Sequence, residues 1–171
     1  MINQLQNNIT MEFNFYAVLV AAAVPLVIGF IWYSPPLFAK TWMREAKLTD
    51  EDLKGSMVKV FGLTYIFSIM IAMMMQALTI HQLGAYGLVG GPEGAEKALP
   101  SFAAFMADYG TVFRTFKHGA LHGCMSGIFL AFPLIAINGL FERKSWKYIF
   151  INSGFWILSM TIMGAIVCGW V

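Results

Sequence analysis

Residues 15–33 read FYAVLVAAAVPLVIGFIWY and contain no charged side chain. A transmembrane helix needs roughly 20 consecutive apolar residues, and this stretch meets that requirement. Three further apolar runs follow, at about 60–83, 113–141 and 147–171. The whole chain is 58% hydrophobic and 12% charged, whereas about 25% of the residues of a soluble domain are charged. We therefore expect an all-α integral membrane fold, a four-helix transmembrane bundle in which residues 1–171 form a single domain.

The positive charges lie mainly in the two loops that follow the first and third runs. Of the eleven Lys and Arg residues, these loops contain Lys40, Arg44, Lys47, Lys54, Lys59, Arg143, Lys144 and Lys147. The opposite side has Lys97, Arg114 and Lys117. Loops rich in Lys and Arg tend to stay on the cytoplasmic side, so both termini are expected outside. The net charge of +2 is too small to indicate nucleic-acid binding, and we expect the lipid bilayer as a partner.

Two connecting segments have helical patterns of their own. Residues 37–56 combine apolar side chains with cations, which is typical of a helix lying at the membrane surface. Within this segment, Thr49 followed by three acidic residues predicts the start of a helix that leads into the second span. The loop after the second run is long and begins with a glycine-rich stretch. Its aromatic residues have helical spacing over 100–109, which predicts a short surface or reentrant helix.

Both ends of the chain carry a recognisable sequence pattern. It comprises WYSPPLFAKTWM at 32–43, LFER at 140–143, INSGFW at 151–156 and MGAI at 163–166, followed by Trp170. The pattern resembles the bacterial family catalogued as domain of unknown function 1761. The resemblance implies a small four-span membrane protein, and it carries over no activity and no catalytic residues. Together with the charge distribution, it implies a bacterial cytoplasmic (inner) membrane with both termini periplasmic.

A polar stripe is predicted at the outer end of the third run. His118 and His122 are four residues apart, so both imidazoles project from one face of a helix. Arg114 lies one turn before them and Ser126 one turn after. Such a pair can bind a polar ligand, relay protons or chelate a metal ion. A metal site needs further ligands, and none has a suitable spacing, so we expect neither metal nor other cofactor. Rings that bond only to neighbouring helices or to interfacial water are the simpler interpretation.

A small residue recurs at every fourth position beside this stripe, at Gly119, Gly123 and Gly127. Small residues at this spacing let two helix backbones approach closely, which is a principal way of packing helices in lipid. The pattern therefore predicts a close helix contact, with another helix of the same chain or with a second subunit.

The sequence contains no motif that is diagnostic of catalysis. It has no phosphate-binding glycine loop, HExxH, nucleophile elbow or CxxC, and acidic residues are absent from the depths of the four runs. We expect a non-enzymatic protein that acts through helix packing, as a homo-oligomer or as an accessory subunit of a larger membrane complex. The alternative is a protein that handles a small molecule or protons in an outward-facing polar pocket at His118 and His122.

Overall fold

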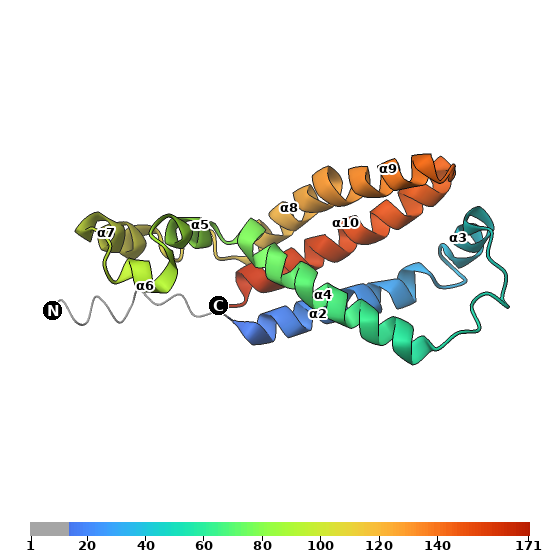
Figure 1. Ribbon diagram of the computed structural model, residues 1–171, viewed down its shortest axis with the longest axis horizontal. Helices are drawn as coiled ribbons and strands as arrows, with labels where there is room; N and C mark the ends of the chain where they lie inside the picture. The colour runs from blue at the N-terminus through green and yellow to red at the C-terminus, as the bar shows by residue number, and fades with distance from the viewer. Residues whose placement is uncertain (1–13) are drawn as a thin grey trace.

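The computed structural model describes residues 14–171, and the regular elements of this part of the chain are all helices (Figure 1). Among the described residues, four helices are long and apolar enough to cross a membrane. They are α2 (Phe15–Trp32), α4 (Met57–Thr79), the continuous helix Phe116–Phe141 and α10 (Trp146–Gly169). The predicted all-α fold with four apolar spans is confirmed.

α10 is the central helix and contacts each of the other three spans. Its Met163 and Val167 pack in one core with Ala21 of α2 and Met75 of α4, and all four side chains are fully buried. The outward faces of the bundle are apolar as well, and Phe30 of α2 is 85% exposed. Because lipid tails are as apolar as these side chains, the outward faces suit a bilayer and the spans are held together by packing around α10.

The third span is interrupted by a turn of π-helix. α8 (Phe116–Ser126) is followed by η1 (Gly127–Ala131) and then by α9 (Phe132–Phe141). The first N–H of α9 bonds to the carbonyl of Gly127, five residues earlier, and Pro133 beside it has no N–H to donate. The wider turn keeps neighbouring backbone groups paired around the proline, so the span continues to residue 141.

The second span differs from its predicted bounds of about 60–83. α4 ends at Thr79, because Ile80 adopts an extended backbone with φ −105° and ψ 98°. A new helix, α5 (His81–Leu88), starts immediately after this break. The residues from 81 to 83 therefore leave the span and open a short external helix. The other three spans lie close to their predicted bounds.

Beyond one end of the bundle lie α5, α6 (Gly91–Ala95) and α7 (Pro100–Tyr109), which together we call the outer layer (Figure 1). α7 occupies the residues that were predicted to form a short helix, whereas α6 and the part of α5 after residue 83 lie in the glycine-rich stretch that was expected to be a loop. The described start of α2 and the end of α10 are at this end of the bundle too. Asn14 Nδ2 donates to the carbonyl of Trp170 at 3.2 Å and ties them together.

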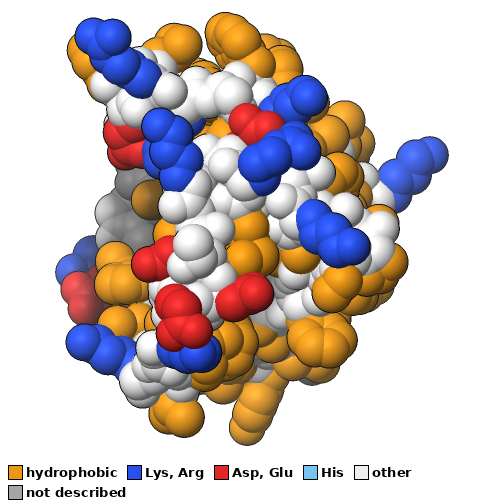
Figure 2. Space-filling view, turned by 90° about the vertical axis from the view of Figure 1, so that its right-hand side faces the viewer, with side chains coloured by type: hydrophobic (Ala, Val, Ile, Leu, Met, Phe, Trp, Pro, Cys, Tyr) orange, Lys and Arg blue, Asp and Glu red, His pale blue; other side chains and the backbone are white. Residues whose placement is uncertain are grey.

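The opposite end, which we call the basic end, consists of α3 (Ala39–Ala46) and the two loops rich in Lys and Arg. Figure 2 looks onto this end, where Lys and Arg side chains are spread over the surface with Asp and Glu among and below them. α3 is the helix expected from the amphipathic pattern of 37–56. Ser145 Oγ donates to Glu45 Oε2 at 2.6 Å, which links α3 to the start of α10.

The helix predicted to begin at Thr49 is absent. The N–H and the hydroxyl of Thr49 both bond to Asp52 Oδ2, but the segment forms turns until α4 starts after its own N-cap, Ser56. The two bonds from Thr49 hold the pKa of Asp52 below its ordinary value. The prediction was wrong because a carboxylate that satisfies the backbone locally stabilises a turn as well as a helix start.

Candidate metal centre

α8 presents two imidazoles on one face. Its N-cap, Thr115, accepts a hydrogen bond through Oγ1 from the N–H of His118 at 3.2 Å, which fixes the first turn. His118 and His122 then lie on successive turns, with ring centroids 4.4 Å apart. The two rings lie side by side, as their spacing indicates.

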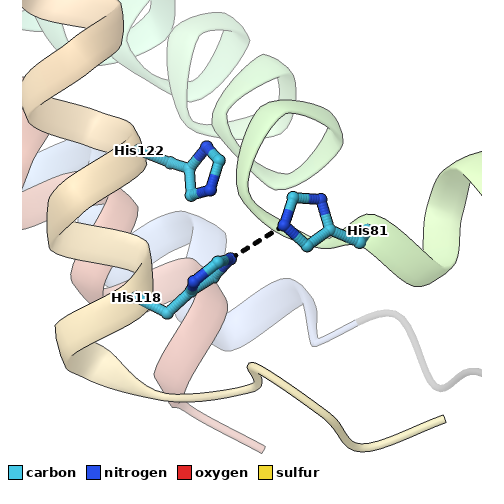
Figure 3. Close-up of side chains that lie close together, drawn as sticks. All are labelled: His81, His118 and His122. Atoms are coloured by element: carbon cyan, nitrogen blue, oxygen red, sulfur yellow. Dashed lines mark hydrogen bonds between the residues drawn. The ribbon is translucent and has the colours of Figure 1, made fainter. Parts of the chain in front are cut away.

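A third imidazole joins this pair from the end of the second span. The break at Ile80 puts His81 at the first position of α5, where its ring faces α8 (Figure 3). His81 Nε2 lies 3.0 Å from His118 Nε2. One nitrogen of each of the three rings lies within 4.8 Å of the other two. We call His81, His118 and His122 the histidine triad.

Phe113 borders the triad on one side. Its ring stacks on that of His118 with centroids 4.9 Å apart, and it meets His81 edge-on at 6.2 Å. Phe113 has a φ of 64°, which is uncommon for a residue other than glycine. Its carbonyl accepts hydrogen bonds from the N–H of Thr115 at 2.8 Å and from Cys168 Sγ at 3.4 Å. These contacts fix the backbone from which the ring reaches the triad.

Two residues of the predicted polar stripe do not reach the triad. Arg114 precedes α8, and its Nε donates to the carbonyl of Cys168 at 3.0 Å, near the end of α10. Ser126 Oγ donates to the carbonyl of His122, four residues earlier in the same helix, at 2.8 Å. Both side chains are thus satisfied by backbone carbonyls, the commonest partners of side-chain donors away from water.

The glycine ridge of the third span packs against α10 of the same chain. A Cβ added at Gly119 would collide with the carbonyl oxygen of Gly164, and one at Gly123 would collide with that of Met160. A Cβ at Gly127 would lie 2.6 Å from a Cα of α10. The two backbones therefore touch directly, and the close contact indicated by the glycine spacing is made within the chain.

The chemistry available at the triad is that of three imidazole lone pairs. His81 is exposed, and the two histidines of α8 are half-buried. Imidazole suits zinc, copper, nickel and iron, whereas magnesium and calcium prefer oxygen ligands. In the part of the chain that the structure describes, no other group of three His, Cys, Asp or Glu side chains converges in this way.

Sequence reasoning missed His81, although a signal was available. His81 lies 37 residues before His118, inside an apolar run that was expected to continue to residue 83. The chain contains three histidines, and each of them falls near the outer end of a predicted span. Three histidines at the same depth in the membrane can form a cluster. The spacing of residues along one helix cannot reveal a member that lies on another helix.

Comparison with known proteins identifies the family of the chain. The model of a family described as a protein of unknown function, DUF1761, matches residues 16–168, a range that includes the whole histidine triad. Neither the curated proteins nor the solved structures gave a match. The description of the family names no activity. Because the match covers most of the chain, this protein belongs to the DUF1761 family.

Proposed function

We propose that this small multi-pass membrane protein binds one divalent transition-metal ion at the outer end of its bundle. The histidine triad is the ligand set. The observation that carries the proposal is the convergence of three ring nitrogens within 4.8 Å. The spacing along the sequence indicates two ligands, and a zinc site requires at least three from the protein. His81 supplies the third.

The triad needs only small side-chain adjustments to hold an ion. Two nitrogens bound to a tetrahedral zinc ion stand about 3.3 Å apart, since Zn–N bonds are about 2.0–2.1 Å long. The Nε2 atoms of His81 and His118 are 3.0 Å apart, and the largest separation within the triad is at most 4.8 Å. Shifts of about 1 Å at the ring nitrogens would therefore bring all three to bonding distance.

His122 adds a second argument. The rings of His81 and His118 are linked by a hydrogen bond between their nitrogens. In the described residues, no side chain or backbone group bonds to a ring nitrogen of His122, although its ring lies 5.0 Å from that of His81. An ion between the rings would give His122 the partner that it does not find among the described residues.

Isothermal titration with Zn²⁺ tests the proposal on the purified full-length chain after removal of metal by a chelator. One ion per chain is expected. Replacing any residue of the triad by Ala should weaken binding by roughly 100-fold or more, because even outer-shell changes at metal sites cost about 10- to 100-fold. Ser126→Ala is the matched control, since this side chain bonds to its own helix. A wild-type chain that binds no zinc, or a His81→Ala chain that binds it as well, would contradict the proposal.

The location of the site is also a proposal. We propose that the triad and both termini lie on the periplasmic side of a bacterial inner membrane, because eight of the eleven Lys and Arg residues lie within 40–59 and 143–147, at or next to the basic end. A C-terminal alkaline phosphatase fusion should be active, and a C-terminal green fluorescent protein fusion should be dark. The reverse result would mean that the triad and both termini lie on the cytoplasmic side of the membrane.

The handling of protons or of a small polar molecule is the second candidate. The contact of 3.0 Å between His81 and His118 favours it, because such a contact shares one proton between two rings. The zinc titration separates the candidates, since this function requires no metal binding. Neither candidate assigns a catalytic step to the protein.

Action through helix packing, as a homo-oligomer or as an accessory subunit, has less support. It was motivated by the glycine ridge, and α10 of the same chain occupies that ridge. Native mass spectrometry in detergent provides the test. A stable homo-oligomer or a co-purifying protein would restore this function, and a lone monomer would count against it.

A further inference from the structure

The fourth coordination position decides what kind of metal site the triad forms. A tetrahedral ion takes four ligands, and the triad offers three. Structural zinc sites fill all four positions with protein side chains, whereas sites that exchange ligands keep one position for water or substrate. The groups around the triad therefore decide whether the chain itself supplies a fourth ligand.

The neighbouring polar side chains are already engaged. Cys168 is fully buried, and its Sγ donates to the carbonyls of Thr79 at 3.5 Å and Phe113 at 3.4 Å. Arg114 and Ser126 bond to backbone carbonyls, and the guanidinium group has no lone pair to offer. No carboxylate of the described residues joins the three ring nitrogens. Among the described residues, no fourth His, Cys, Asp or Glu side chain converges on the triad, so the fourth position has no protein side chain of these four types.

One member of the triad is exposed at the outer end of the bundle. α10 closes the glycine face of α8, and Phe113 covers one side of the triad. The three rings point into the space between α8 and α5 (Figure 3), and His81 at the edge of this space is exposed. The exposed His81 is therefore the member of the triad that molecules outside the protein would meet first.

The charge of the site selects the class of ligand. Three neutral imidazoles leave the full double charge of a divalent ion uncompensated, because none of the ligands is anionic. A nearby aromatic ring lowers the local dielectric constant and strengthens the attraction of the ion for an anion. Water would occupy the position when no anion is present, and its proton would be easier to remove than in bulk water.

We propose that the metal ion held by the triad keeps one open coordination position, which takes an exchangeable small anion or water from the outer side. This inference rests on the proposed metal binding. The triad would then form a site that exchanges ligands, in contrast to a structural metal site in which protein side chains fill all four positions.

Cobalt substitution tests the open position directly. Co²⁺ replaces zinc in such sites, and its visible absorption bands report the ligands that surround it. The full-length chain in detergent would be loaded with Co²⁺ and titrated with sodium azide as the probe anion. The bands should shift and the shift should saturate, and no thiolate-to-cobalt absorption should appear.

A variant completes the inventory of ligands. Glu12 is the one acidic residue outside the described residues, so Glu12→Gln removes the remaining carboxylate. The azide response should be the same in this variant and in the wild type. A response that appears only in Glu12→Gln would show that the chain fills the position itself, which would overturn the inference.

The remaining outcomes distinguish this inference from the proposed function. If Co²⁺ binds but azide leaves its spectrum unchanged in both the wild type and Glu12→Gln, the site is closed. The inference then fails, although the proposed metal binding is supported. If Co²⁺ produces no bound-state absorption at all, the proposed function fails with it.

Discussion

The two ends of the bundle differ in how their most prominent polar side chains are hydrogen-bonded. At the basic end, polar groups are paired: Tyr33 Oη donates to Asn152 Oδ1 at 2.9 Å, and Ser145 donates to Glu45 at 2.6 Å. At the outer end, three imidazoles stand together with one hydrogen bond among them. Paired groups close a structure, whereas a cluster of lone pairs without a matching donor is suited to an added ligand. The comparison therefore favours structural roles for the pairs at the basic end and supports the proposed ion binding at the outer end.

The largest effect is expected where α8 meets α10, because this contact positions the two histidines of α8. Gly123→Ala would drive a Cβ into the carbonyl oxygen of Met160, and neither helix backbone can move away freely. We expect a loss of about 3 kcal/mol or more in the free energy of unfolding, at the upper end of overpacking effects, together with weaker zinc binding at His122. Thermal unfolding in detergent measures the first effect and zinc titration the second.

Gly62→Ala is the matched control for this prediction. Gly62 lies in α4, and a Cβ there would meet nothing within 4 Å. It should leave stability unchanged or slightly improved, because alanine favours a helix more than glycine does. Equal stability of the two variants would mean that the α8 and α10 backbones are not in direct contact.

The next effect concerns the outer end alone. Zinc at 100 times its dissociation constant should raise the free energy of unfolding by about 2.7 kcal/mol, because the ion binds the folded chain. A chelator should reverse the gain, and His81→Ala should abolish it. Ser126→Ala should keep it. Stabilisation by zinc that persists in His81→Ala would place the ion elsewhere and break the contrast between the two ends.

A smaller effect is expected at the basic end. Tyr33→Phe removes the hydroxyl that donates to Asn152, and a partly buried hydrogen bond of this kind contributes about 1 kcal/mol. Zinc should stabilise this variant as much as the wild type. Tyr16→Phe is the control, because Tyr16 is 76% exposed and should tolerate the change. A Tyr33→Phe chain with altered zinc affinity would show that the two ends are not independent.

The smallest effect is a pH dependence of α3. The hydrogen bond from Ser145, followed by that from Arg44, holds the pKa of Glu45 below its ordinary value. Because the pKa is lower in the folded state, this contribution is complete above the unfolded pKa of about 4.3 and is lost as the pH falls through the folded pKa. Amide hydrogen exchange in α3 should therefore accelerate, relative to the rest of the bundle, as the solution is acidified below about pH 4.

Two variants complete this test. Glu45→Gln should remove the acid-dependent part of the exchange. Glu142→Gln, which changes a nearby exposed carboxylate, should leave it in place. Exchange in α3 that shows the same dependence in all three chains would exclude Glu45 as its source.

The four spans could be predicted from the sequence because their length and lack of charge leave few alternatives in a bilayer. The break after Thr79 could not. Ile80 is neither proline nor glycine, and its extended backbone is accompanied by tertiary contacts: Gln82 of α5 donates to the carbonyls of Tyr109 and Val112. An apolar run shows which residues can lie within the membrane. It does not show at which residue a helix ends and the chain leaves the membrane.

The candidate site was half predictable for a related reason. The spacing of His118 and His122 sets their relation on one helix, so the sequence is sufficient for that pair. Arg114 shares the spacing, but it precedes the helix and bonds to the end of α10. The partnership with His81 depends on how α4 and α8 pack, which no pattern within a single helix contains.

The extended residue between α4 and α5 has one more consequence. The outer layer is joined to the spans at Ile80 and also through residues 110–115, which lead into α8, so a change of angle at Ile80 that moved His81 relative to His118 and His122 would have to be matched in this second connection. If the proposed ion binds, its affinity would depend on the angle between the membrane spans and the outer layer. By thermodynamic reciprocity, any molecule that stabilises this position of the outer layer would raise the affinity for the ion, and the ion would stabilise the outer layer by the same free energy.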